Sequence, residues 1–272
     1  MPFPDISPIA FSIGPFALRW YALGYLAGVF GGAWYATSLL RRPQLWARDK
    51  PPFASGAIWD FAFWAMVGIV IGGRVGYVLF YNLPQYAADP IKVFALWDGG
   101  MSFHGGLVGI MLAMAWFVRR RGGSILSGFD LLGSIATIGI FIVRITNFIN
   151  GELYGKPSGD LAWGVIFPTA GDGVPRHPTQ LYEAGLEGLA TFLIVLVCTW
   201  HLNTLKRPGL TAGIFAICYS ASRILVEFYR LPDEQVGYLF GTGWITMGMM
   251  LTLPLLATGI ALIATAMARP RG

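Results

Sequence analysis

The chain has 272 residues, of which 55% are hydrophobic and only 12% are charged, with a mean hydropathy of +0.60. Soluble domains carry about a quarter charged residues, so this composition disfavours a soluble enzyme and predicts a membrane bundle. The formal net charge is +5, but the basic residues form short clusters between apolar runs, which disfavours a nucleic-acid-binding surface. Cys198 and Cys218 both fall inside apolar runs, so we expect neither a structural disulfide nor a CxxC metal site.

Apolar segments recur along the whole chain. The N-terminal residues lack the basic region of a cleavable signal peptide, and we expect them to stay in the mature protein. A helix needs about 20 apolar residues to cross the hydrocarbon of a bilayer. Seven stretches fit this rule: 16–40, 57–80, 103–118, 129–149, 182–200, 209–228 and 243–266. The sequence therefore predicts an all-α polytopic membrane protein, a single membrane domain over residues 1–272 with about seven transmembrane helices.

Lysine and arginine are distributed unevenly between alternate loops. The loops after the first, third, fifth and seventh stretches hold Arg41, Arg42, Arg48, Lys50, Arg119, Arg120, Arg121, Lys206, Arg207, Arg269 and Arg271. The other loops carry Lys92, Lys156, Arg176 and Arg230. Cytoplasmic loops are enriched in Lys and Arg. We therefore expect a multi-pass protein of the bacterial cytoplasmic (inner) membrane, with its N-terminus outside, its C-terminus cytoplasmic and an outer loop or small periplasmic cap over residues 151–180.

Small residues repeat along the first two stretches. The glycines at four-residue spacing are Gly24, Gly28, Gly32, Gly68, Gly72 and Gly76. In lipid, small residues on one helix face allow the close approach of a neighbouring helix. We interpret these glycines as packing positions without a chemical role.

Polar residues gather in the outer half of the bilayer once this topology is applied. They are Arg19, Tyr21, Arg74, His104, Arg144, Asn147, Asn150, Arg223, Glu227 and Arg230. The inner half carries only Asp60 and Asp130, at helix ends. Glu227 lies one helical turn from both Arg223 and Arg230, so it can pair with either. This count leaves Arg74, Arg144 and one of the arginines beside Glu227 without an acid.

Arginines without acidic partners are informative inside a membrane. A charge at the bilayer centre costs roughly 2.5–3.5 kcal/mol on insertion scales, so a surplus of arginines indicates an absent anion. A lipid phosphate fits, because the planar guanidinium donates two parallel hydrogen bonds. The alternative is that the arginines reach the interface or bond to backbone carbonyls, and it weighs most for Arg74 and Arg19.

His104 is the strongest candidate for a catalytic base. It stands among Gly99, Gly100, Gly105, Gly106 and Gly109. Glycines let a ligand approach the imidazole, and a histidine beside a cationic site tends to be neutral and able to accept a proton. The alternative is an interfacial histidine at the start of a helix. The chain has no HExxH, GxSxG or P-loop motif, so we expect no metal site and no serine-hydrolase or NTPase chemistry.

A set of short motifs extends this interpretation. In chain order they are "GGRVGYVLFYN", "WDGGMSFHGGLVG", "NFINGELYG", "RHPTQLYE" and "RILVEFYRLPD". In order and over nearly the whole chain they resemble the prolipoprotein diacylglyceryl transferases. The resemblance implies transfer of the diacylglyceryl group from phosphatidylglycerol to the lipobox cysteine thiol of a prolipoprotein signal peptide. It implies a thioether product, glycerol phosphate as leaving group, and the first step of bacterial lipoprotein maturation.

The resemblance also carries residue roles. The catalytic residues it implies are Tyr21, His104, Arg144 and Arg223, and those that bind phosphatidylglycerol are Arg144, Asn147, Glu152, Gly155, Arg223 and Glu227. Membrane lipids and lipobox peptides are the implied partners, with no nucleic acid, metal or cofactor. The family usually has glycines on both sides of the equivalent arginine, whereas this chain has Val143 and Thr146. Helix packing around Arg144 must therefore differ.

Two other functions use the same residues. A transporter or channel for an anionic solute would employ the arginines, but alternating access needs polar groups at the midplane and usually broken, repeat-related helices. The bare inner halves of the predicted spans disfavour it. An intramembrane hydrolase acting on lipid phosphate would use the same phosphate site, and only the resemblance separates it from a transferase.

Overall fold

The computed structural model describes residues 1–14, 16–80, 82–96, 99–232 and 237–269. Five residues of the motifs and charge counts lie outside these ranges: Tyr81, Trp97, Asp98, Asp233 and Arg271. The long helices are α1 (Trp20–Leu40), α2 (Ile58–Phe80), α4 (Phe103–Arg120), α5 (Ile125–Ile149), α7 (Thr191–Trp200), α8 (Leu210–Glu227) and α9 (Met247–Ala268). The shorter helices include α3 (Leu83–Ala88), α6 (Thr179–Glu183) and the π-helix η7 (Ala184–Ala190), and α6, η7 and α7 follow one another without a break.

Short strands and 3-10 turns fill the connections. Strands β1 (Ile9–Ile13) and β2 (Phe16–Arg19) pair antiparallel, as do β3 (Val165–Ile166) and β4 (Pro175–Arg176). The 3-10 turns are Pro43–Leu45, Ala47–Asp49, Ser55–Ala57, Pro90–Phe94, Pro168–Ala170, Thr204–Lys206 and Leu239–Gly241. The first predicted span therefore begins with a strand over residues 16–19, and its helix starts at Trp20.

A helix occupies each of the seven predicted apolar stretches. In the described part of the chain, the segments both long and apolar enough to cross a membrane are Ser55–Phe80, Ile125–Ile149, Thr179–Trp200, Leu210–Glu227 and Met247–Ala268. The protein is thus a mostly helical, multi-pass membrane protein. α1 and α4 are 21 and 18 residues long, and their crossing of the bilayer stays a prediction.

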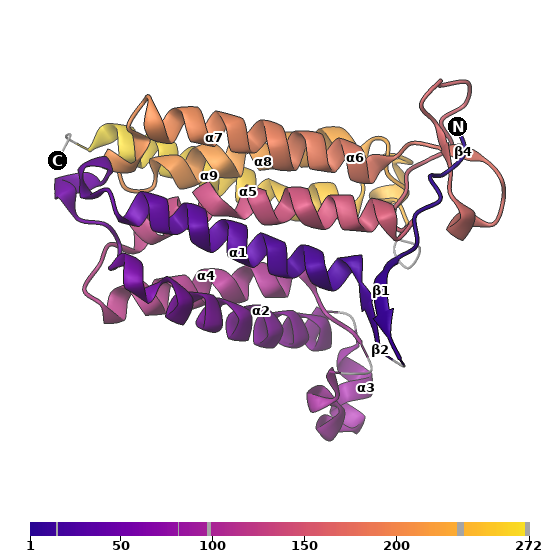
Figure 1. Ribbon diagram of the computed structural model, residues 1–272, viewed down its shortest axis with the longest axis horizontal. Coiled ribbons are helices and arrows are strands. Elements are labelled where there is room, and N and C mark those ends of the chain that lie inside the picture. Colours follow the sequence, from indigo (N-terminus) through magenta and orange to yellow (C-terminus); the bar gives the residue numbers. More distant parts are fainter. Residues whose placement is uncertain (15, 81, 97–98, 233–236, 270–272) are drawn as a thin grey trace. The chain divides into compact units, whose positions relative to one another are not determined.

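The chain forms two compact units, residues 1–35 with 130–272 and residues 36–129. In the second unit, α2 and α4 run side by side (Figure 1). Their backbones touch, because a Cβ on Gly72 would stand 2.3 Å from the carbonyl oxygen of Gly105, and one on Gly68 would stand 2.6 Å from that of Gly109. This close approach confirms the packing role predicted for the glycines of α2.

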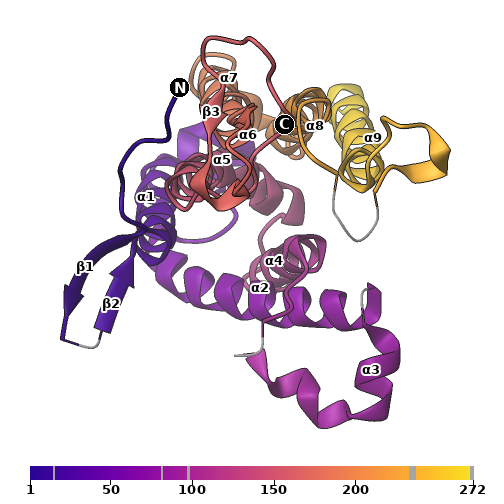
Figure 2. The same cartoon turned by 90° about the vertical axis from the view of Figure 1, so that its right-hand side faces the viewer.

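The first unit contains most of α1 and α5, together with α6–η7–α7, α8 and α9. α8 lies against α9 and α7 (Figure 2). α1 meets α5 through Gly24, whose Cβ would stand 2.5 Å from Cγ2 of Thr146. Gly24 on α1 therefore leaves the room that the side chain of Thr146 needs on α5. That the packing around Arg144 differs from the rest of the family stays a prediction.

Candidate active site

One end of the first unit collects buried charges from three helical segments. α5 and α8 finish at this end, whereas α6 begins there (Figure 1). The charged residues are Arg144, Glu183, Glu187, Arg223, Glu227 and Arg230, which we call the arginine–glutamate cluster. Glutamates and arginines are equal in number, so the cluster is neutral when every member is ionised.

Glu183 is the centre of the cluster. Its side chain is fully buried, and its Oε1 accepts hydrogen bonds from Arg223 Nη1 at 2.5 Å and Arg230 Nη1 at 2.7 Å. Its Oε2 lies 3.2 Å from Arg144 Nε. One carboxylate therefore fixes guanidinium groups from two helices and from the loop that follows α8.

Glu187 is placed by an irregular stretch of helix. Residues Ala184–Ala190 form a π-helix, a rare feature that occurs mostly as single turns inside α-helices and is frequent at functional sites. Gly188 allows η7 to approach α5 closely, since its Cβ would stand 2.7 Å from Cβ of Phe141. Glu187 is fully buried, with ion-pair distances of 3.4 Å to Arg144 Nη2 and 3.7 Å to Arg223 Nη1. Its contacts are longer than those of Glu183.

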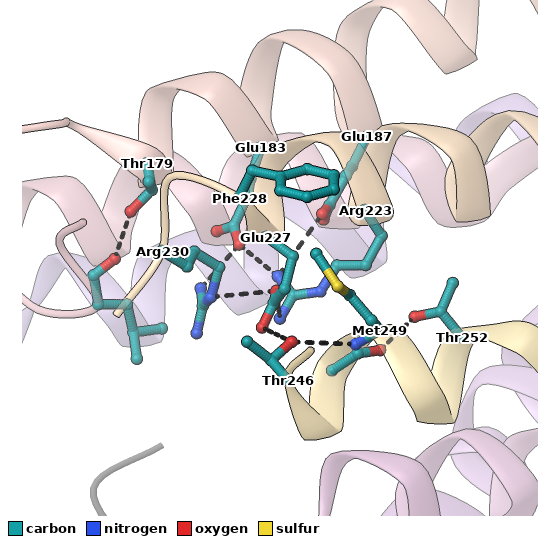
Figure 3. A network of polar contacts seen from close by, with 12 residues as sticks. Thr179, Glu183, Glu187, Arg223, Glu227, Phe228, Arg230, Thr246, Met249 and Thr252 are labelled. Carbon is teal, nitrogen blue, oxygen red and sulfur yellow. Dashed lines mark hydrogen bonds and ion pairs between the residues drawn. The ribbon is translucent and has the colours of Figure 1, made fainter. Parts of the chain in front are cut away.

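Glu227 completes the cluster from α8 itself. Its Oε2 lies 2.8 Å from Arg223 Nη2 and 3.5 Å from Arg230 Nε, so it pairs with both arginines on its helical face, as its spacing predicted. Figure 3 shows the carboxylates of Glu183 and Glu227 converging on these two guanidinium groups.

The expectation that Arg144 and one of Arg223 and Arg230 lack acidic partners was wrong. Glu183 and Glu187 provide those partners from a different helix, whereas the spacing argument considered pairs within one helix only. A signal was present in the sequence, because two glutamates four residues apart interrupt an apolar run at high cost in a membrane.

Arg74 was the third arginine expected to lack an acidic partner, and backbone carbonyl groups surround its guanidinium. Its guanidinium donates to the carbonyl oxygens of Lys92, Val93, Ala95, Gly99 and Gly100, all in the connection between α2 and α4. These bonds correspond to the alternative in which the arginine satisfies backbone carbonyls. Arg74 therefore orders a loop in the second unit.

Asn147 and Glu152 meet at the end of α5. With its amide oriented to satisfy both partners, buried Asn147 donates to Val143 O at 3.1 Å and to Glu152 Oε1 at 3.2 Å. Asn150 Nδ2 also approaches Glu152 Oε1, at 3.4 Å. Gln180 Nε2 donates to the carbonyl oxygen of Glu152. The two asparagine amides hold the exposed Glu152 carboxylate at the end of the helix that carries Arg144, and Gln180 holds the main chain of Glu152.

Gly155 has no room for a side chain. Its Cβ would stand 2.5 Å from the carbonyl oxygen of Tyr229 and 2.7 Å from Cγ2 of Thr179. Its N–H donates to His177 O at 2.9 Å, and it forms a bridge with Arg230. Gly155 thus joins the predicted cap, residues 151–180, to the arginine–glutamate cluster.

The cap contains a histidine beside two aromatic side chains. His177 Nδ1 lies 3.1 Å from Tyr182 Oη, and the same oxygen accepts a hydrogen bond from Trp163 Nε1 at 2.7 Å. Partial burial lowers the pKa of His177 below its ordinary value, and the positive charge of Lys156 adds to this effect. The neutral imidazole is therefore favoured in the folded protein.

Tyr21 and His104 belong to different units. Tyr21 lies one turn before Gly24 on α1, so it faces the last turns of α5, and its hydroxyl lies 3.0 Å from that of Tyr25. His104 is half-buried in the first turn of α4, which begins after the N-cap Ser102, in the second unit. A partnership of His104 with Arg144 stays a prediction.

The cluster leaves donors for a ligand. A guanidinium has five N–H donors. Glutamates engage Nε and Nη2 of Arg144, and among the described residues its Nη1 has neither a hydrogen bond nor an ion pair. The side chains of Arg144 and Arg223 are 16% and 14% exposed. Two arginines held by buried carboxylates, with donors to spare, can bind a phosphate.

Comparison with known proteins agrees with this chemistry. A model of the family described as prolipoprotein diacylglyceryl transferase matches residues 8–265. Curated relatives from Brucella canis, Brucella ovis and Brucella abortus are each 52% identical over 258 residues, covering 95% of this chain and 91% of the relative. Each of them is named phosphatidylglycerol–prolipoprotein diacylglyceryl transferase. The chain belongs to the prolipoprotein diacylglyceryl transferase family.

Proposed function

We propose that this protein transfers the diacylglyceryl group of phosphatidylglycerol to the lipobox cysteine thiol of prolipoproteins, the first step of bacterial lipoprotein maturation. Membership of the family and the names of the relatives support the reaction. The observation that carries the mechanism is the arginine–glutamate cluster, in which buried carboxylates orient Arg144 and Arg223 without consuming all of their donors.

The reaction is a substitution at carbon. The cysteine thiolate attacks the glyceryl carbon that bears the phosphate ester, a carbon–sulfur bond forms, and the carbon–oxygen bond breaks. Its electron pair stays with the departing glycerol phosphate, where Arg144 and Arg223 stabilise the growing negative charge. The thiol proton passes to a base, because the thiolate is the nucleophile and an ordinary cysteine is mostly protonated near neutral pH.

Five further residues have proposed roles. We assign His104 as the base on its glycine-rich sequence setting, with Tyr21 as a proton relay. Asn147 and Glu152 orient the lipid headgroup, a role supported by the hydrogen bond that joins them at the end of α5. Gly155 keeps the cap close to the cluster. Holding lipid and peptide together supplies proximity.

The proposed topology has seven spans, with α1 and α4 crossing the bilayer along with the five most apolar segments. The N-terminus and the cap face outward, the C-terminus faces the cytoplasm, and the cluster lies in the outer leaflet. Single cysteines placed at Lys50 and at Asp160 should label from opposite sides with a membrane-impermeant thiol reagent. Labelling of both from the outside would contradict this topology.

The decisive experiment for function is a reconstituted transfer reaction. Purified protein is incubated with phosphatidylglycerol and a lipobox peptide, and the peptide is weighed by mass spectrometry. We expect a mass gain of one diacylglyceryl group and release of glycerol phosphate. Lipid hydrolysis with an unmodified peptide would indicate a hydrolase instead. His104→Gln is included as an arm: folded protein without product supports the base assignment, and wild-type rates contradict it.

A further inference from the structure

The start of α9 touches the arginine–glutamate cluster although the helix carries no charged residue. Thr246 is the N-cap of α9 and is buried. Its Oγ1 accepts a hydrogen bond from Met249 N–H at 3.2 Å and lies 2.9 Å from Glu227 Oε1. An ionised carboxylate only accepts hydrogen bonds, so the hydroxyl proton of Thr246 is donated to Glu227. Figure 3 shows this chain of contacts from Met249 through Thr246 to Glu227.

Gly248 also packs closely against the same carboxylate. A Cβ at this position would stand 2.6 Å from Glu227 Oε1, 2.9 Å from Cδ and 3.0 Å from Oε2. The carboxylate cannot move away from such a Cβ without disturbing its ion pair with Arg223, because its Oε2 lies 2.8 Å from Arg223 Nη2. The start of α9 therefore fixes the carboxylate of Glu227 in two ways. Thr246 donates a hydrogen bond to it, and Gly248, which has no side chain, leaves it the space it occupies.

We propose that Thr246 and Gly248 are positioning residues of the transfer reaction. They fix the carboxylate of Glu227, and Glu227 in turn orients the guanidinium of Arg223 toward the phosphate. This inference rests on the proposed role of Arg223 as a phosphate ligand. Its consequence is that the uncharged helix α9 controls the rate of the chemical step.

The test separates positioning from helix capping. Thr246→Val removes the hydroxyl with little change of shape, and Thr246→Ser restores it. Thr246→Asp keeps the cap, since aspartate is a good N-cap residue, but it has no proton to donate and repels Glu227. Thr252→Val is the matched control on the same helix, because the Thr252 hydroxyl donates to Gly248 O at 2.7 Å and not to the cluster.

We expect Thr246→Val to lose about tenfold or more in kcat, the scale of one hydrogen bond to a charged group, with a smaller change in KM for phosphatidylglycerol. Thr246→Ser should retain most of the rate, Thr246→Asp should fall at least as far as valine, and Thr252→Val should match wild type. A fully active Thr246→Asp would reduce Thr246 to a helix cap and overturn the proposal.

A second variant, Gly248→Ala, separates an effect on helix α9 from an effect on the transfer rate. Alanine favours a helix over glycine, so Gly248→Ala does not weaken α9 itself. We expect kcat to fall nonetheless, because the methyl group displaces Glu227. Gly139→Ala is the control, since a Cβ there meets no atom within 4 Å. Wild-type kcat in Gly248→Ala contradicts the positioning role, whereas wild-type protein that forms no product contradicts the proposed function.

Discussion

The two ends of α8 hold buried carboxylates in contrasting surroundings. At its start, fully buried Asp130 accepts backbone N–H groups from Gly209 at 2.7 Å and Ala212 at 2.8 Å. At its end, the cluster glutamates meet side chains, mostly guanidinium groups. A backbone N–H at a helix start is fixed and its dipole favours an anion, whereas a guanidinium can change partner when a ligand arrives. The nature of the partners, more than burial, separates a structural charge from one suited to chemistry.

The largest effect is expected at Glu183, and it tests the contrast between the two ends of α8. Glu183→Gln leaves Arg144, Arg223 and Arg230 sharing fewer negative charges in a buried setting. Removing one member of a buried ion pair costs about 3–5 kcal/mol, so we expect a large fall in the unfolding midpoint in detergent together with lost transfer.

Glu187→Gln is the matched control for Glu183→Gln. The ion-pair distances of Glu187 are 3.4 and 3.7 Å, so we expect a smaller loss of stability than at Glu183. Equal losses at the two positions would contradict the central role of Glu183.

The lysine variants of Arg144 and Arg223 test whether the reaction needs a planar guanidinium that can bind two partners at once. Arg223 uses Nη1 for Glu183 and Nη2 for Glu227, and a single ammonium cannot reproduce this bridge or a bidentate phosphate contact. We expect Arg144→Lys and Arg223→Lys each to lower transfer per folded molecule by ~100-fold or more, the scale of one preorganised oxyanion donor. Arg121→Lys, in a partly exposed pair with Asp60 at 3.3 Å, should keep wild-type activity. Wild-type activity in both cluster variants would remove the phosphate-clamp mechanism.

The helices were predictable from the sequence because hydropathy and length act locally. A helix lies in each predicted apolar stretch, and the pairing of Glu227 with Arg223 and Arg230 followed from helical spacing. The β1–β2 hairpin was missed, since residues 16–19 are as apolar as the helix they precede. Here composition alone does not distinguish a strand from the start of a membrane helix.

The cluster was only half predictable, because its partners come from separate helices. Glu183 and Arg144 are 39 residues apart in the sequence, and no spacing rule links them. Thr246 gave no signal at all, since a threonine before a helix reads as an ordinary N-cap. Its contact with Glu227 requires the packing of α9 against α8.

A moderate effect is expected at the structural end of α8. Asp130→Asn keeps the size of the side chain but replaces one accepting oxygen with an amide group that cannot accept from a backbone N–H. We expect a loss of about 1–3 kcal/mol in stability, the cost of one unsatisfied buried donor, with unchanged transfer per folded molecule. A tenfold loss of activity in folded protein would show that the two ends of α8 are coupled, contrary to the comparison above.

The smallest effect concerns the cap next to the cluster. Because burial and Lys156 lower the pKa of His177 from 6.5, the unfolded chain binds a proton more tightly than the folded protein does. Stability must then fall as the pH drops below about 6.5, and it is fully present at higher pH. Thermal unfolding midpoints between about pH 5 and 8 should show this slope in wild type and a flatter profile in His177→Gln.

The carboxylate of Asp172, whose pKa is lowered by its hydrogen bond with Arg176, affects stability in a separate pH window, below its ordinary pKa of 3.8. Asp172→Asn should therefore leave the slope above pH 5 unchanged, and an equal flattening in that variant would exclude His177 as its source.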